Sequence, residues 1–138
     1  MSFEIYFLSF EDIVEIHDRA IAEFGGMPGI KDEGLLRSAI DQPRMTSFGA
    51  ECYPTLVEKA AALAFSLIKN HSFHDGNKRV GLGALQTFLR INGFEIIASD
   101  DEEVDATIKE AVILKVAASE IGREEFVDWL SRYVTIVE

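Results

Sequence analysis

Several features that mark particular classes of protein are missing from this sequence. With one cysteine, Cys52, the chain cannot form an internal disulfide. No uncharged apolar run approaches the ~20 residues that a membrane-spanning helix needs. Residues 1–10 lack the basic start of a signal peptide and carry Glu4. There is no repeat, low-complexity stretch or Gly-, Pro- or Ser-rich linker. We therefore expect residues 1–138 to form one domain that resides in the cytoplasm and contacts no membrane.

Basic charge is also scarce. The formal net charge is -11, which argues against direct binding of nucleic acid through a basic surface. Residues 56–95 are the exception, because they hold five bases against three acids, a net charge of +2, and leave -13 for the rest of the chain. A positive stretch in an acidic protein indicates where an anionic ligand would bind, although bases that only solvate helix faces would give the same count.

Apolar periodicity predicts an all-α fold, a compact domain of about six helices with at most a short N-terminal strand. Caps and breakers place the helices at residues 9–24, 32–41, 55–70, 77–92 and 99–118, with a last helix that follows Gly122 and includes Val134. Residues 3–7 are predicted to be a short edge strand or an extended lead-in, and residues 94–98 an extended link. Residues 44–53 show no clear period, which predicts a loop that is either a plain connector or a flap beside an active site.

The pattern also predicts which positions are buried. The third helix should be central, because residues 60–68 are apolar nearly all round. We expect Trp129 to fill the core and Leu35 to face it. Gly81 and Gly83 weaken the helix that holds them by ~1 kcal/mol each relative to alanine, but they would let another backbone or a ligand come close.

The segment His-Ser-Phe-His-Asp-Gly-Asn-Lys-Arg, residues 71–79, joins two predicted helices and is the best candidate for a functional site. The backbone amides of Gly76, Asn77 and Lys78 would be unpaired donors at a helix N-terminus, which is a ready site for an anion such as phosphate. Lys78 and Arg79 add positive charge where the helix dipole disfavours it by ~0.3–1 kcal/mol per residue. This placement implies an anion, or the aspartate of the same loop, that balances them.

Two other side chains of this loop suit chemistry on a bound phosphate. Asp75, the only acid in the loop, would hold Mg²⁺, which bridges phosphate oxygens. His71 would curl back over the same place, and it is the candidate general base because an imidazole is suited to proton transfer near neutral pH. Phe73 should point inward and pin the loop, His74 should be exposed to solvent, and His17 should have a structural role.

Each of these residues, taken singly, also has a plainer interpretation. A lone histidine is more often a cap or surface residue than a base. Asp75 or Asn77 would serve as a helix cap, and Lys78 with Arg79 would form a solvated first turn. The occurrence of all of them within nine residues favours the functional interpretation.

The pattern His71-x-Phe73-x-Asp75-Gly76-Asn77-Lys78-Arg79 resembles the signature of the Fic family, H-x-F-x-[D/E]-G-N-x-R. Residues 29–40, closed by Pro43, and residues 84–93 resemble the corresponding helices of the death-on-curing (Doc) branch of this family. The resemblance covers roughly residues 10–95. It implies the compact helical Fic/Doc fold and the cofactors ATP and Mg²⁺.

The resemblance also implies an activity for these residues. In Doc toxins the γ-phosphoryl group of ATP is transferred to a hydroxyl of elongation factor Tu. His71 would accept the proton of the target serine or threonine, and Asp75 would hold the metal. Gly76, Asn77, Lys78 and Arg79 would bind the phosphates. His71, Asp75, Lys78 and Arg79 are thus the expected catalytic residues.

Lys78 and Leu82 favour the kinase branch, because AMP-transferring members have glycine and a second arginine at these two positions. Gly76, where the Doc pattern has alanine, favours AMP transfer instead, so nucleotidyl transfer stays open as an alternative. A catalytically inactive module that binds a nucleotide or a partner is a further alternative.

Control by a separate antitoxin is expected as well. Self-restraining Fic proteins carry the pattern [S/T]-x-x-x-E-[G/N]. The two nearest matches, Ser47 to Glu51 and Ser99 to Glu103, are followed by cysteine and valine and do not complete it. An inhibitor would therefore have to act in trans.

Overall fold

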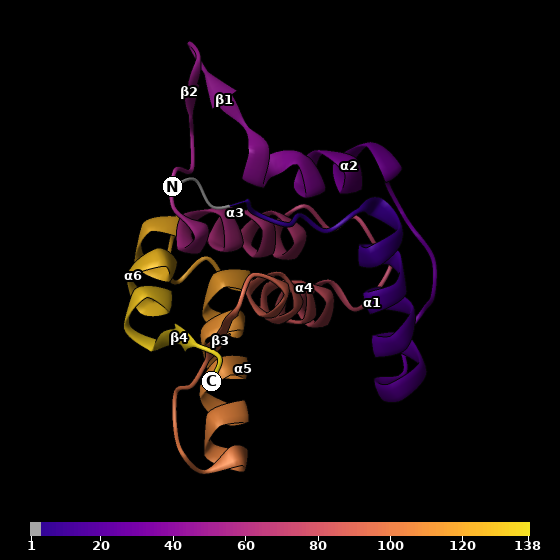
Figure 1. The fold of residues 1–138 in the computed structure, drawn as a ribbon. Coiled ribbons are helices and arrows are strands. Elements are labelled where there is room, and N and C mark those ends of the chain that lie inside the picture. The colour runs from indigo at the N-terminus through magenta and orange to yellow at the C-terminus, as the bar shows by residue number, and fades with distance from the viewer. Residues whose placement is uncertain (1–3) are drawn as a thin grey trace.

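The computed structural model describes residues 4–138, and helices dominate this part of the chain (Figure 1). The elements are α1 (Phe10–Phe24), α2 (Glu33–Asp41), the 3₁₀ helix η1 (Gln42–Arg44), β1 (Thr46–Ser47), β2 (Ala50–Glu51), α3 (Leu56–Lys69), α4 (Asn77–Ile91), β3 (Phe94–Ile96), α5 (Glu102–Ala117), α6 (Arg123–Tyr133) and β4 (Val134–Ile136). β1 pairs with β2 and β3 pairs with β4, both antiparallel. The prediction of an all-α fold with about six helices is confirmed for the described residues. None of these helices is both long enough and apolar enough to cross a membrane.

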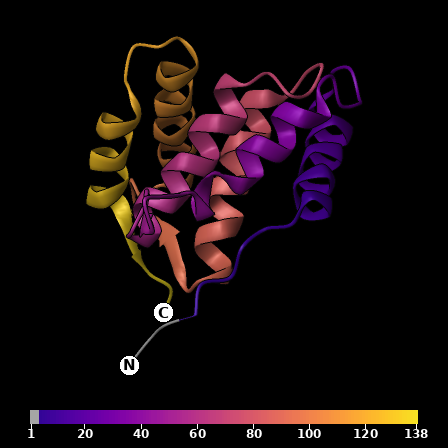
Figure 2. The same cartoon turned by 90° about the horizontal axis from the view of Figure 1, so that it is seen from above.

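The helix pair α3 and α4 forms the centre of the fold. α3 begins with the predicted capping box, in which the Thr55 side chain accepts from the Glu58 amide and the Glu58 side chain accepts from the Thr55 amide. Of residues 60–68, which are predicted to be buried, 60–64, 67 and 68 are buried and 65 and 66 are partly buried. α1 and α2 pack on one side of the pair and α5 and α6 on the other (Figure 2).

The glycines of α4 allow its neighbours to approach closely. A Cβ atom at Gly81 would lie 2.5 Å from Cγ1 of Ile68 in α3, and one at Gly83 would lie 2.7 Å from Cγ2 of Ile16 in α1. Neither distance is tolerated between carbon atoms, so only glycine fits without a shift of the neighbour. The helix that follows the loop of residues 70–76 is thus packed tightly against the two helices beside it.

Of the two alternatives predicted for residues 3–7, the strand is not found, because residues 4–9 form no strand; Phe3 lies outside the described residues. The rest of the N-terminal half differs from the sequence prediction in two places. Leu35 is 42% exposed, because the buried face of α2 is formed by its neighbours Leu36, Ala39 and Ile40. The predicted loop at residues 44–53 contains the β1–β2 hairpin, which turns at Phe48 and Gly49 with positive φ at both. The hairpin projects away from the helices (Figure 1).

The C-terminal half corrects three further predictions. The N-cap of α5 is Asp101 rather than Ser99, since the Asp101 side chain accepts from the Val104 amide. The last helix ends at Tyr133, so that Val134 belongs to β4 and pairs with Ile96. Trp129 does not fill the core: it is partly buried at the edge, where its ring centroid lies 5.0 Å from that of Tyr133.

Candidate functional site

The segment between α3 and α4 is held by the turn that follows α1. The amides of Lys31 and Asp32 donate to the Ser72 carbonyl oxygen at 2.7 and 3.0 Å, and the His74 amide donates to the Gly29 carbonyl oxygen at 3.2 Å. A bridge between Ile30 and Phe73 completes this short antiparallel pairing. The segment from Asn70 to Gly76, which we call the motif loop, thus has a defined backbone although it contains no helix or strand.

Asn77 closes the motif loop with its side-chain amide. Its Oδ1 accepts from the Phe73 amide at 3.1 Å, and its Nδ2 donates to the Phe73 carbonyl oxygen at 3.0 Å. Phe73 is buried, as predicted. Asn77 is therefore not the cap of α4, and both hydrogen bonds of its amide fix the shape of the motif loop.

α4 begins without a side-chain cap. Its N-cap residue is Gly76, in the left-handed conformation with φ +76° and ψ +18°, and no side chain accepts from the first amides of the helix. An α-helix leaves these amides without partners of its own, and the helix dipole places partial positive charge beside them. The N-terminus of α4 therefore has free backbone donors of the kind that can bind an anion.

Asp75 lies at the edge of this N-terminus but does not cap it. Its Oδ2 accepts from the Met27 amide at 3.0 Å, which turns the carboxylate toward the segment after α1. The other oxygen, Oδ1, has no hydrogen bond within residues 4–138, and the residue is exposed. A single carboxylate with one free oxygen fits Mg²⁺, which keeps several waters and takes its other ligands from phosphates. No group of three or more metal-ligating side chains occurs among the described residues.

His71 turns the chain out of α3. It has φ +52°, a left-handed conformation that is uncommon for a residue with a side chain. Its imidazole is exposed and makes no hydrogen bond to any described residue. The predicted general base is therefore free to meet a substrate, and an uncommon backbone conformation of this kind is often found at functional sites.

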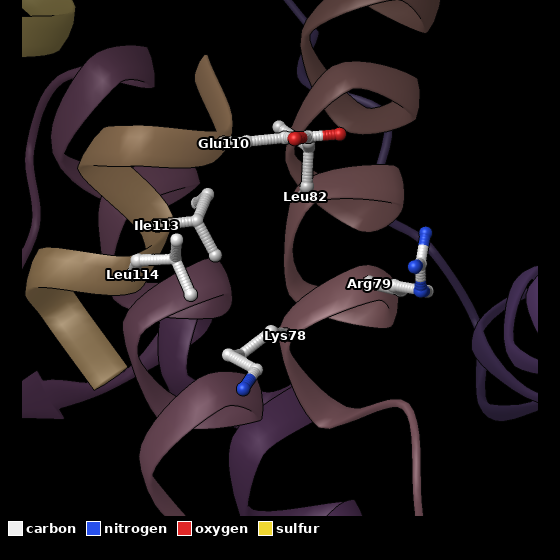
Figure 3. A pocket seen from close by; sticks show the side chains of 6 residues that line it. All are labelled: Lys78, Arg79, Leu82, Glu110, Ile113 and Leu114. Atoms are coloured by element: carbon white, nitrogen blue, oxygen red, sulfur yellow. The ribbon is translucent and has the colours of Figure 1, made fainter. Parts of the chain in front are cut away.

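The side chains of Lys78 and Arg79 point in different directions from the first turn of α4, although both residues line one pocket (Figure 3). The Lys78 side chain faces a pocket of about 180 Å³ between α4 and α5, together with Leu82, Ile113 and Leu114. The Arg79 guanidinium lies 3.8 Å from the ring centroid of Phe24 in α1, a cation–π contact. The two bases thus flank the helix N-terminus from two sides, because successive helical residues point about 100° apart.

Sequence reasoning missed the part that His17 plays in this site. The predicted structural role did not specify its contacts: this histidine of α1 is 1% exposed and stacks on the Phe73 ring, with centroids 3.7 Å apart and planes 10° apart. Its Nε2 lies 2.7 Å from the Asp75 carbonyl oxygen. The spacing of four residues from Ile13 and from Ile21 was the available signal, since it places position 17 on the inner stripe of the helix.

Comparison with known proteins agrees with this geometry. The chain is 47% identical over 78 residues to Toxin Doc of Mycolicibacterium smegmatis, an alignment that covers 56% of this chain and 60% of that protein. It is 30% identical over 125 residues to Protein kinase doc of Escherichia phage P1, which covers 91% of this chain and 93% of that protein. A sequence model of the Fic/DOC family matches residues 7–89. Because this match spans more than half of the chain and includes the entire motif loop, the chain belongs to the Fic/Doc family.

Proposed function

We propose that this protein is a Doc-type toxin that transfers the γ-phosphoryl group of ATP to a serine or threonine hydroxyl of a protein target. The observation that carries the proposal is the uncapped N-terminus of α4, with Gly76 in the left-handed conformation and Lys78 and Arg79 in the first turn. The name of one relative, Protein kinase doc, supports a kinase, and the name of the other, Toxin Doc, supports a toxin.

The proposed reaction uses the exposed side chains around the motif loop. His71 accepts the proton of the target hydroxyl while the hydroxyl oxygen attacks the γ-phosphorus. The bond from the γ-phosphorus to the bridging oxygen breaks, and ADP leaves. The first amides of α4, with Lys78 and Arg79, stabilise the charge on the phosphate oxygens. Asp75 would hold Mg²⁺, which when bound neutralises part of that charge.

Three residues bear on the choice between phosphoryl and AMP transfer. Leu82 lines the same pocket as Lys78, so no second arginine is available on that face of α4 for an AMP-transferring arrangement. The Lys78 side chain fills space there that a glycine would leave open. Gly76 favours the alternative, in which the enzyme is a nucleotidyltransferase. A binding module without activity is the least favoured function, because His71 and Asp75 are both present and exposed.

Elongation factor Tu is the target that we propose, and a separate antitoxin the inhibitor. The absence of an internal inhibitor is supported by the two partial matches to the self-restraining pattern. Ser47 and Glu51 lie in the β1–β2 hairpin rather than in a helix. Ser99 precedes α5, and only Glu103 belongs to that helix.

The proposal is tested by incubating the purified protein with elongation factor Tu and MgATP labelled at either the α- or the γ-phosphate. We expect the γ label alone to be transferred, with a mass increase of about 80 Da, that of one phosphoryl group. His71→Ala should reduce the rate by about 10²–10⁴-fold. His74→Ala is the matched control, since His74 lies in the same loop, is exposed and contributes only its backbone.

Each other outcome identifies an alternative. Transfer of the α label with an increase of about 329 Da, that of AMP, would establish the nucleotidyltransferase. Binding of ATP without transfer of either label, to this factor or to the proteins of a cell extract, would favour the inactive module. An equal loss of activity in both histidine variants would reject His71 as the specific base.

A further inference from the structure

We propose that His17 is a positioning residue that fixes the orientation of the peptide between Asp75 and Gly76. In this orientation the Asp75 carbonyl faces inward, and the Gly76 N–H faces the N-terminal end of α4. The inference rests on the proposed function in one respect, namely that phosphate binds at this end of the helix.

The orientation follows from a single hydrogen bond. The Asp75 carbonyl oxygen can only accept, so His17 Nε2, at 2.7 Å, must carry the proton and donate it. In a trans peptide the C=O and N–H vectors point in opposite directions. Since the carbonyl is held toward the buried ring of His17, the Gly76 N–H points away from it, outward from the core.

Without this bond the peptide would have a second orientation open to it. Gly76 is at φ +76°, and glycine populates both signs of φ with similar ease. A rotated peptide would direct the carbonyl oxygen toward the phosphate site, where it would repel the ligand. A donor at His17 Nε2 therefore selects the orientation that binds an anion.

The imidazole is held on one face by Phe73, on which it stacks with ring centroids 3.7 Å apart. The Phe73 backbone is in turn fixed by its two hydrogen bonds with the Asn77 side chain. Glycine at position 76 leaves room for the ring, because a Cβ there would lie 3.3 Å from Nε2. The stack and the hydrogen bond to the Asp75 carbonyl together define the place of the ring.

Stability alone does not explain a histidine at this position. Nδ1 of His17 is buried and has no hydrogen-bond partner within the described residues. The nearest carboxylate oxygen, on Asp18, is 3.9 Å away, which is too far for a hydrogen bond. A buried acceptor without a partner destabilises the folded state, and this cost offsets part of what the Nε2 hydrogen bond to Asp75 contributes. An apolar ring would lack the donor at Nε2, and it could not hold the Asp75 carbonyl.

Two variants separate the donor from the ring. His17→Phe keeps an aromatic ring against Phe73 and removes the donor. His17→Gln keeps a donor of similar reach and removes the ring. We expect H17F to melt close to the wild-type temperature, because it removes the unpaired Nδ1 together with the Nε2 hydrogen bond. It should nevertheless bind MgATP about tenfold to a hundredfold more weakly, the loss of one hydrogen bond to a charged group. H17Q should melt at a lower temperature and recover most of the affinity.

Binding is measured by titration calorimetry with MgATP and stability by thermal unfolding. A third measurement does not depend on ATP: a long-range ¹H–¹⁵N spectrum of the wild type should show His17 as the Nε2–H tautomer. The Nδ1–H tautomer would overturn the inference, as would wild-type affinity in H17F. A parallel loss of stability and affinity in H17F would show a merely structural role and would overturn it too.

Failure of the proposed function has a different signature. If the wild type itself does not bind MgATP, the phosphate site is wrong whatever His17 does. Crystal structures of the wild type and H17F then decide the remaining question. A rotated or mixed 75–76 peptide in H17F supports the positioning role, and an unchanged peptide overturns it.

Discussion

The amide of Asn77 should matter more for ligand binding than its contribution to stability alone would suggest. Asn77→Ala removes both hydrogen bonds to the Phe73 backbone, at 3.1 and 3.0 Å. Each is worth about 1 kcal/mol, and about 1 kcal/mol more is lost because buried backbone groups remain unpaired. Alanine recovers about 0.5 kcal/mol through its helix propensity. We therefore expect the free energy of unfolding to fall by about 2–3 kcal/mol, and the melting temperature by roughly 6–12 °C.

Asn92 provides a matched control at the other end of the same helix. Its side-chain amide also bonds to the backbone, accepting from the Tyr6 amide at 2.9 Å and donating to the carbonyl oxygens of Tyr6 and Phe88 at 2.9 and 2.8 Å. Asn92→Ala should cost about 1–2 kcal/mol, because the bonds to Tyr6 are exposed. This variant should leave the motif loop intact.

Urea unfolding gives the stability of each variant, and calorimetry gives the affinity for MgATP. N77A should bind MgATP at least tenfold more weakly than the wild type, whereas N92A should bind it equally well. Two results would refute the reasoning: unchanged MgATP affinity in N77A, or a free energy of unfolding within about 0.5 kcal/mol of the wild-type value.

Three further variants test other parts of the structure. Gly81→Ala should lower the free energy of unfolding by about 1–3 kcal/mol, because its Cβ would lie 2.5 Å from Ile68 Cγ1; an unchanged urea midpoint would contradict this packing. Lys78→Gly should reduce γ-phosphoryl transfer and allow some AMP transfer, both of which mass spectrometry of the modified target measures. Undiminished phosphoryl transfer without any AMP transfer would contradict this. Burial raises the pKa of Asp105, but hydrogen bonds from Lys109 and the backbone outweigh it and hold the pKa below 3.8. The stability that Asp105 contributes is present above the unfolded-state pKa and is lost as pH falls through the lower folded-state pKa. D105N should therefore be less stable than the wild type at pH 7 and should lose less stability on acidification. Free energies of unfolding that depend on pH in the same way in both proteins would contradict this.

The elements that could be predicted from the sequence are those with local signals. Ser9 and Thr55 cap α1 and α3 through bonds that span three residues, and the glycine that starts α4 is part of a recognisable motif. For the same reason the motif loop was identified as the candidate site. Such features depend on neighbours in the chain, which a sequence displays directly.

The features that escaped prediction depend on contacts between distant residues or on elements too short to show a period. β1 and β2 have two residues each, so no alternation can reveal them. Ile96 precedes α5 and Val134 follows α6, so their pairing joins segments that two helices separate along the chain. His17 and Asp75 are 58 residues apart, and only the packing of α1 against the motif loop brings them together.

The pairing of residues 29–32 with residues 72–74 makes the site dependent on a part of the chain that contains none of the motif. If α1 and the following turn detach, all nine motif residues remain, but the loop loses the donors of Lys31 and Asp32, the Met27 amide and the His17 ring. Local opening of this N-terminal segment would then abolish binding while α3 and α4 stay folded. In a hydrogen-exchange experiment, the amide hydrogen of Lys31 should therefore exchange with solvent at the rate at which this segment opens and the ligand site is lost. Exchange of the Lys31 amide only upon global unfolding would mean that the motif loop and the rest of the fold are lost together.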